Sequence, residues 1–260
     1  MSEAVAKARL LWMFVRADFK SRYAGSSVGF FWSVIHPLIM LVVYTVVFSE
    51  FLDLKFNPGG STGDFALNLF CGMLPWTALA GSIQRGVVCF QDNAVLLTKS
   101  RFPAIMLPLH IVVSEMLSLL IGLVLLVVFA MFFKSLPSWH LLLMPIVILF
   151  HFAFVLGLSW MAATVQVYFR DLRHFLDSFM LVWLFLTPVF YPPGMYPKRY
   201  QILLHANPMA HLVGIYREIV LNHRLPQVQG MAIFFSMSML IFFLGYLVFR
   251  RARPKLADRL

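Results

Sequence analysis

Charged side chains are scarce in this chain. They make up 12% of its 260 residues, whereas a typical soluble domain carries about 25%. Hydrophobic residues reach 61%, so most of the surface must face something other than water, and a soluble globular protein is excluded. A surface of this kind is stable in lipid. The composition therefore predicts an integral membrane protein.

The sequence also lacks several short motifs that mark enzyme and metal sites. None of its 14 glycines precedes a lysine, so the G-x-x-x-x-G-K-[ST] phosphate loop for nucleotides is absent. The zinc spacings H-E-x-x-H and C-x-x-C are absent as well. The two cysteines, Cys71 and Cys89, are too far apart on one straight helix to form a disulfide, and we interpret them as packing residues. We expect no catalytic residue, no metal ligand and no cofactor in this chain.

Long apolar segments dominate what is present. Six of them carry almost no charge, Glu115 being the exception in the third, and each is long enough to cross a hydrocarbon core of about 30 Å as a helix. Apolar residues do not recur with a period of two, which favours helices over a β-barrel. We predict one all-α transmembrane domain over residues 1–260, with six spans at residues 30–52, 65–88, 103–133, 139–169, 175–191 and 228–250.

The distribution of Lys and Arg predicts the orientation. With a cytoplasmic N-terminus, fifteen of these residues lie on the inner side, which is the bias that cytoplasmic loops carry. Both termini are therefore predicted to be cytoplasmic. Because the positive charge follows topology and suits anionic lipid, we expect contacts with membrane lipids and none with nucleic acid. The six outer residues are Lys55, Lys134, Lys198, Arg199, Arg217 and Arg224.

The N-terminal segment, residues 1–23, is predicted to form a helix that lies in the membrane interface. Trp12, Val15 and Phe19 fall in one arc of this helix, and Arg16 and Lys20 fall in another. Part of the helix could instead rest against a partner protein.

A second segment, residues 195–222, is apolar but broken at Asn207 and Pro208. Asn207 can cap the following helix, and Pro208 suits its first position. Two half-length apolar helices favour an outer re-entrant hairpin before the last span. One kinked interfacial helix is the alternative.

Few residues within the spans could carry chemistry. Glu115, with His110 five residues earlier, is the one candidate for proton coupling, and a hydrogen bond to a neighbouring helix is the alternative that we favour. Aromatic residues, 16% of the chain, recur near the span ends, as is typical of an interfacial belt. Some of them could instead line a conduit for a sugar chain, because ring faces suit C–H groups and polar tips suit hydroxyls.

Five stretches of the sequence resemble the permeases of polysaccharide exporters in the ABC-2 type family. They match that group in order and spacing over nearly the whole chain, and the resemblance is greatest to O-antigen exporter permeases of the Wzm type. The stretches are RADFKSRYAGSSVGFFWSVIHPL (16–38), NAVLLTKSRFP (93–103), RDLRHF (170–175), TPVFYPPGMYP (187–197) and NPMAHLVGIYREIVL (207–221).

The resemblance implies a homodimer that works with two separate Wzt-like ATPase subunits, which bind ATP and Mg²⁺. The complex would export undecaprenyl-diphosphate-linked O-antigen polysaccharide across the bacterial cytoplasmic (inner) membrane. A capsule or teichoic acid permease of the same family is the near alternative. An ion-coupled secondary carrier would require inverted repeats, and an intramembrane enzyme acting on lipid phosphates would require a clustered acid, histidine and arginine. We find neither pattern in the sequence.

The same resemblance implies three groups of site residues. The lipid pyrophosphate would be received by basic side chains and backbone donors around a Gly- and Ser-rich hinge, namely Lys20, Arg22, Tyr23, Ser26, Ser27 and Gly29. A short helix would couple transport to the ATPase through Asn93, Leu97, Lys99 and Arg101. The glycan conduit and its gate would be lined by Phe30, Trp32, Trp183, Tyr191 and Tyr196.

Overall fold

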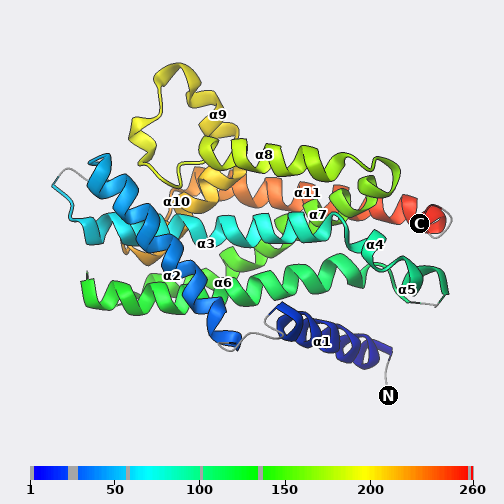
Figure 1. Ribbon diagram of the computed structural model, residues 1–260. Helices are drawn as coiled ribbons and strands as arrows, with labels where there is room; N and C mark the ends of the chain where they lie inside the picture. Colours follow the sequence, from blue (N-terminus) through cyan, green and yellow to red (C-terminus); the bar gives the residue numbers. More distant parts are fainter. Residues whose placement is uncertain are drawn as a thin grey trace.

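The protein is predominantly helical in the residues that the structure, a computed structural model, describes: 3–22, 29–56, 59–99, 102–133, 137–256 and 259. No strand occurs in these ranges (Figure 1). Five helical segments among them are long and apolar enough to cross a membrane, namely Val34–Phe51, Thr62–Gly86, Met106–Phe132, Trp139–Tyr168 and Val228–Leu256. The prediction of an all-α, multi-pass membrane protein is confirmed.

The helices follow one another with short connections. They are α1 (Glu3–Arg22), α2 (Trp32–Thr45), α3 (Thr62–Gly86), α4 (Cys89–Asp92), α5 (Ala94–Lys99), α6 (Met106–Phe133), α7 (Met144–Tyr168), α8 (Leu172–Leu186), α9 (Gln201–Ala206), α10 (Pro208–Val220) and α11 (Val228–Leu256). The chain also forms short 3-10 turns at Gly29–Phe31, Trp139–Leu143, Pro193–Met195 and Lys198–Tyr200, and α2 continues as a π-helix over Val46–Phe51.

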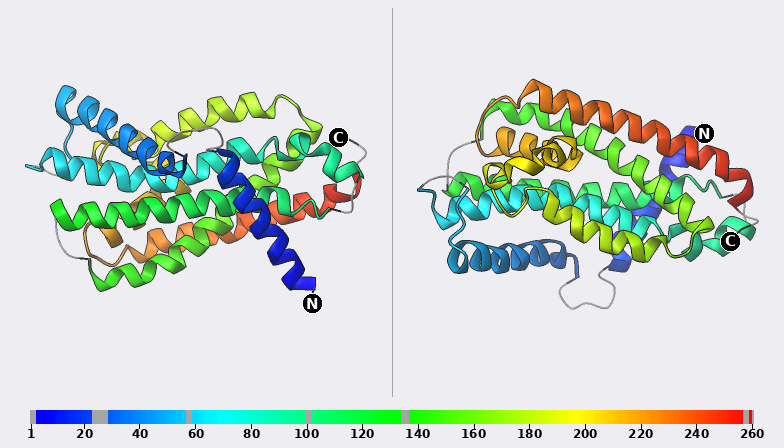
Figure 2. Two further views of the ribbon diagram at one scale, coloured as in Figure 1. Left: turned by 60° about the horizontal axis from the view of Figure 1, so that its bottom comes forward. Right: turned by 90° about the horizontal axis from the view of Figure 1, so that it is seen from above.

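Four long helices, α3, α6, α7 and α11, run side by side as a bundle (Figures 1 and 2). Helix α3 packs against α6, α7 and α10, and its inward side chains form much of the buried core. Helices α4 and α5 lie with both chain ends toward one end of the bundle, and α9 and α10 lie toward the other. None of the side chains described in α2 is buried.

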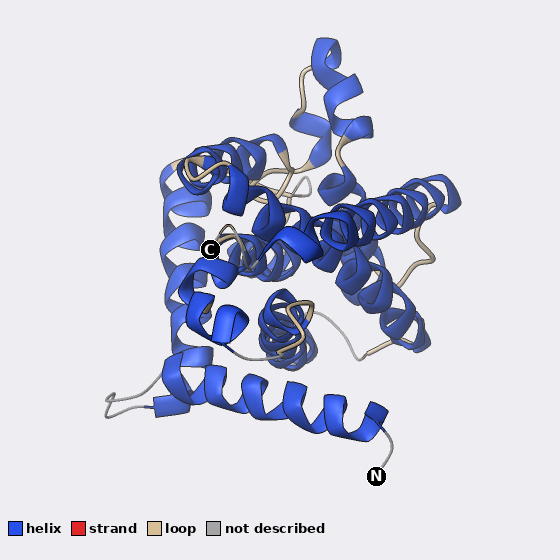
Figure 3. Ribbon diagram, turned by 90° about the vertical axis from the view of Figure 1, so that its right-hand side faces the viewer, coloured by secondary structure: helices blue, strands red, loops and turns tan. Residues whose placement is uncertain are grey.

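Helix α1 runs across the axis of the bundle rather than along it (Figure 3). It packs against α6, and its buried residues are Val15 and Asp18. Trp12, which the apolar arc placed with Val15, is half exposed, with Arg16 over its ring. The face of α1 that packs against the bundle therefore contains a buried carboxylate as well as apolar side chains.

Two local predictions are borne out in the described chain. Cys71 and Cys89 are free and buried, as expected of packing residues. The break at residues 207 and 208 is present, because Asn207 caps α10 by accepting a hydrogen bond from the backbone N–H of Met209 at 3.0 Å, and Pro208 is the first helical residue.

Helix α8 is shorter than the predicted span at residues 175–191. It begins at Leu172 and ends at Leu186, and its 15 residues fall short of the five membrane-length segments. The helix ends here because Pro188 restricts Thr187 to extended backbone, and Thr187 has ψ 132°.

Candidate functional site

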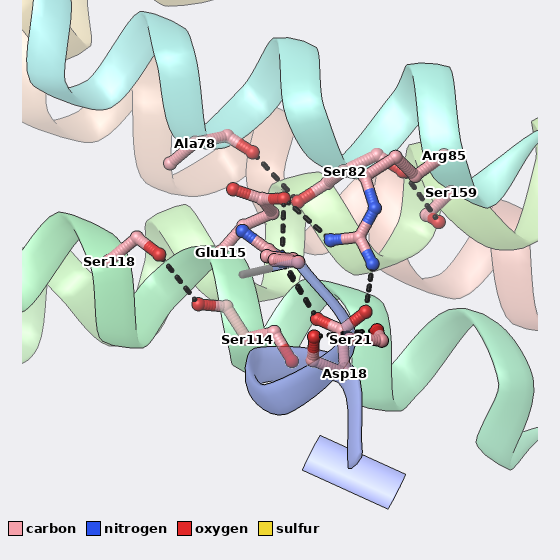
Figure 4. Close-up of polar contacts among 10 residues, drawn as sticks. Asp18, Ser21, Ala78, Ser82, Arg85, Ser114, Glu115, Ser118 and Ser159 are labelled. Carbon is pink, nitrogen blue, oxygen red and sulfur yellow. Dashed lines mark hydrogen bonds and ion pairs between the residues drawn. The ribbon is translucent and has the colours of Figure 1, made fainter. Parts of the chain in front are cut away.

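Four charged side chains form a cluster that joins three helices. Asp18 and Arg22 lie on α1, Arg85 lies at the end of α3, and Glu115 lies in the first half of α6. Figure 4 shows Asp18, Arg85 and Glu115 pointing toward one another. Arg85 donates from Nη1 to Oε1 of Glu115 at 2.9 Å and from Nη2 to Oδ1 of Asp18. Arg22 donates from Nη2 to the same Glu115 oxygen at 2.8 Å and from Nε to Oδ2 of Asp18 at 3.0 Å. Each guanidinium therefore bridges both carboxylates.

The cluster is balanced in charge and largely removed from water. Asp18 and Glu115 are buried, whereas 20% of the Arg22 side chain and 35% of the Arg85 side chain remain exposed. Burial raises the pKa of Asp18, but the guanidiniums of Arg22 and Arg85 outweigh that effect and hold its pKa below the ordinary value. Asp18 is therefore ionised at neutral pH and secures α1 to the bundle.

Gly81 of α3 makes room for the Glu115 carboxylate. A Cβ atom at Gly81 would lie 2.8 Å from Cδ and 2.9 Å from Oε1 of Glu115, so the carboxylate lies directly against the α3 backbone. The favoured interpretation of Glu115, a hydrogen bond to a neighbouring helix, is thereby confirmed, and its partners come from two other helices.

A cavity of about 610 Å³ lies beside this cluster, between α2, α3 and α6. Arg22 and Glu115 line it, together with Trp32 and His36 of α2. Its remaining lining is mostly apolar and consists of Pro37, Met40, Phe70, Met73, Leu74, Thr77, Ala78, Ser118, Leu119 and Gly122. A charged group beside an apolar wall suits an amphiphilic ligand.

The predicted headgroup residues fall partly in the described chain. Arg22 reaches the cavity, Lys20 is exposed on α1, and Gly29 has φ +54°, the left-handed conformation that glycine adopts without strain. Tyr23, Ser26 and Ser27 lie outside the described residues. The structure thus brings Arg22, and not Lys20, to the cavity wall.

The predicted coupling residues lie at the end of the bundle that carries both termini. Asn93 separates α4 from α5, and its amide donates to the carbonyl of Cys89 at 2.9 Å. Leu97 packs against the core, Lys99 is exposed, and Arg101 lies outside the described residues. Their short helix therefore presents one anchored face and one exposed face.

Gln166 of α7 links α4 to the turn between α7 and α8. Its amide nitrogen donates to the Gln91 side chain at 3.4 Å and to the Arg170 carbonyl at 2.8 Å. Its oxygen accepts from the backbone N–H of Arg173 at 3.0 Å. Both connections at this end of the bundle thus share one buried amide, which the sequence analysis did not single out.

The predicted conduit residues do not form one continuous group. Trp32 lines the large cavity, whereas Trp183 packs edge-on against Trp76 with ring centroids 5.7 Å apart. Tyr191 and Tyr196 lie together, with ring centroids 6.3 Å apart, in a separate pocket of about 490 Å³ near α9. The side chain of Phe30 lies outside the described part of the structure.

Arg217 of α10 fixes the segment that follows α8. Its buried guanidinium donates to the carbonyls of Asn68 at 3.2 Å, Pro188 at 2.7 Å and Val189 at 2.8 Å. The space for it exists because Gly72 has no side chain: a Cβ there would lie 2.9 Å from Nη2 of Arg217. Sequence analysis counted this arginine only as an outer charge.

Asn207 makes the second link between α8 and α10. Its side-chain oxygen accepts from Nε1 of Trp183 at 2.9 Å, and its nitrogen donates to Oγ1 of Thr187 at 2.9 Å. The same oxygen caps α10. One buried side chain thus starts one helix and holds the end of another.

Replacement of Asn207 by alanine should lower the free energy of unfolding by about 2 kcal/mol, because a helix cap and two interhelical hydrogen bonds are lost. Asn207→Ser keeps an oxygen that can cap α10 but is too short to reach Trp183. The serine variant should therefore recover about half of the loss. Thermal unfolding of the purified protein in detergent measures both effects, and equal midpoints for alanine and wild type would contradict the assignment.

The similarity to known proteins extends over nearly the whole chain. The family model described as ABC-2 type transporter matches residues 9–221. The O-antigen export system permease protein RfbA of Myxococcus xanthus is 32% identical over 251 residues, which cover 96% of this chain and 94% of that protein. Two proteins of Klebsiella pneumoniae with the same name are 25% and 26% identical over 253 and 250 residues, with the same coverage.

Proposed function

The chain belongs to the ABC-2 type transporter family, and from this we propose that it is the permease subunit of an ATP-driven exporter that moves lipid-linked O-antigen polysaccharide across the cytoplasmic membrane. The observation that carries the proposal is the 32% identity to an O-antigen export permease over 96% of this chain. The absence of a nucleotide loop agrees with it, because a permease of this kind takes its energy from a separate subunit.

The proposed topology has six crossings with both termini in the cytoplasm. The five membrane-length segments supply five of them, and α8, which lies alongside the bundle, supplies the sixth together with the residues that follow it. Helices α9 and α10 would form the outer re-entrant hairpin. Their place at the opposite end of the bundle from α4, α5 and the chain ends supports this arrangement.

The proposed assembly is a homodimer with two Wzt-like ATPase subunits, in the bacterial inner membrane. The ATPase would contact α5 through Lys99 and the neighbouring Arg101, while Leu97 and Asn93 transmit its movement into the bundle. The exposed half of α5 and the anchored position of Leu97 support this division of roles.

The pyrophosphate of the lipid carrier would be received at the cavity beside Arg22. Phosphate groups bind guanidinium forks through charge-assisted hydrogen bonds. Arg22 is the predicted headgroup residue that lines the cavity, and the cavity wall beyond it is apolar, as the lipid chain requires. The exposed Lys20 and the following hinge would complete the site. The aromatic pocket around Tyr191 and Tyr196 would form the outer gate.

Deletion of the gene in its own bacterium tests the proposal. We expect loss of surface O-antigen and accumulation of lipid-linked polymer inside the cell, with recovery when the chain is supplied again. Proteoliposomes that hold the chain and its ATPase should export the polymer only with ATP. Loss of capsule or teichoic acid with O-antigen intact would assign another polymer, and transport without any nucleotidase would overturn the mechanism.

A further inference from the structure

Another, smaller pocket lies at the end of the bundle that carries both chain ends. It has a volume of about 190 Å³ and is enclosed by α1, the start of α6 and the end of α11. Lys7, Arg250 and Arg253 provide its charged lining. Its other lining residues are Pro103, Ala104, Ile105, Met106, Tyr246 and Phe249.

The geometry of α11 brings two of the charged side chains to the same side of the pocket. Arg250 and Arg253 are three residues apart on α11 and therefore share one face, whereas Arg251 lies about 100° around the helix and does not line the pocket. Among the described residues, no carboxylate forms an ion pair with Arg250 or Arg253. Lys7 adds a cation from a helix far away in the sequence. The lining thus includes three basic side chains from two helices.

The position of the pocket matches the depth of lipid headgroups. Residues 228–249 of α11 carry no charge, and Arg250, Arg251, Arg253 and Lys255 follow directly. This change marks the boundary between hydrocarbon and water. Tyr246, one turn before Arg250, is 38% exposed and combines an apolar ring with a polar tip, as residues at that boundary do.

We propose that this pocket binds the phosphodiester headgroup of an anionic phospholipid. Arg250 and Arg253 hold the phosphate, and Lys7 completes a three-cation site that ties α1 to α11 through the lipid. Ile105, Met106 and Phe249 contact the carbon atoms next to the headgroup. Met106, the first residue of α6, also lines the pocket, so the positive end of that helix dipole lies close to it.

A lipid fits this pocket better than a free anion does. A free phosphate would leave the apolar half of the lining unused, whereas a lipid covers both halves at once. The volume, below the roughly 300–1,000 Å³ of sites that enclose a whole ligand, suits a headgroup whose chains stay in the bilayer. The inference concerns a resident lipid and does not depend on the exported cargo.

Native mass spectrometry on the full chain, extracted from vesicles of phosphatidylcholine with phosphatidylglycerol, tests the proposal. The double variant Arg250→Gln, Arg253→Gln should retain phosphatidylglycerol about tenfold less than wild type. The matched control Arg251→Gln, Lys255→Gln removes the same charge from the same helix end without touching the pocket, and it should retain the lipid within twofold. Lys7→Gln, on another helix, should weaken retention as well.

Two results would overturn the proposal. Equal loss of phosphatidylglycerol in the pocket variant and in the matched control would mean that only general surface charge attracts the lipid. Binding of millimolar inorganic phosphate in place of phosphatidylglycerol, with the same dependence on Arg250 and Arg253, would make the pocket a free-anion site. Thermal unfolding of each variant shows whether it is folded, and Lys7→Gln provides an independent readout if the double variant is unstable.

Discussion

Replacement of Arg85 by methionine is expected to release α1 from the bundle. The substitution removes one of the two guanidiniums that bridge Asp18 and Glu115, and it leaves two buried carboxylates to share Arg22. Breaking a buried ion pair from one side costs about 3–5 kcal/mol, and because Arg85 is partly exposed we expect about 3 kcal/mol. This loss of stabilising free energy weakens the packing of α1 against the rest of the chain.

Spin labels on α1 and α6 measure this release directly. Met13 and Val124 are exposed on these helices, and the native Cys71 and Cys89 are buried, so labels at Met13→Cys and Val124→Cys report one distance. In Arg85→Met the distance distribution should broaden.

The matched control for this measurement is Arg16→Met, which removes one charge from the exposed side of α1. It should leave the distribution unchanged, because Arg16 is exposed and lies over the ring of Trp12 on the same helix. An unchanged distribution in Arg85→Met would show that Arg85 is not needed to hold α1 against the bundle.

The helices of this fold were predictable because lipid imposes a simple rule on the sequence. Long charge-free segments must be helical in a membrane, so the segments around α3, α6, α7 and α11 follow from composition. The break before α10 was predictable as well, because Asn207 and Pro208 act on their own backbone. Local sequence features therefore predict both the long helices and the start of α10.

The ion cluster could not be predicted in the same way. Asp18 and Arg22 are four residues apart on one helix, a spacing that indicates a pair. Arg85 and Glu115, however, join them only because α3 packs along α6 and α1 packs across α6, and that packing depends on side-chain shape at many positions. Gly81 gives a retrospective signal, since a glycine opposite an acid in a span allows close approach.

The same limit applies to Arg217 and to the aromatic residues. Counting charges places Arg217 on the outer side but does not show that it is buried against three carbonyls. The sequence analysis grouped Trp32 with Tyr191 and Tyr196, whereas the fold places Trp32 and the tyrosines in different cavities. Residue type predicts the chemistry of a site, and tertiary packing decides which residues share it.

The largest effect of a single substitution is expected at the crossing of α7 and α11. A Cβ atom at Gly245 would lie 2.7 Å from the Cα and C atoms of Gly157, and a Cβ at Gly157 would lie 2.7 Å from Cα of Phe242. The obstructing atoms belong to the backbone, so no side-chain rotation can relieve the clash. Small residues at such crossings allow helix backbones in membranes to pack closely.

Gly245→Leu should therefore separate α7 from α11 and lower the free energy of unfolding by at least about 4 kcal/mol, above the usual cost of overpacking a core. Separation also breaks the contacts of Trp160 with Phe242 and Phe249, whose ring centroids lie 5.5 and 6.4 Å away. The protein should then fail to accumulate in the membrane. The milder Gly157→Ala should accumulate but unfold at a clearly lower temperature.

Gly214→Ala in α10 is the matched control for this prediction. A Cβ at Gly214 meets no atom within 4 Å, and alanine is the better helix former by about 1 kcal/mol, so this variant should be as stable as wild type or more stable. The amount of each glycine variant in the membrane and its thermal unfolding midpoint separate the effect of close helix packing from that of helix propensity. If Gly157→Ala were as stable as Gly214→Ala, the two helices would have to be able to separate without cost, and the close crossing would not hold the bundle together.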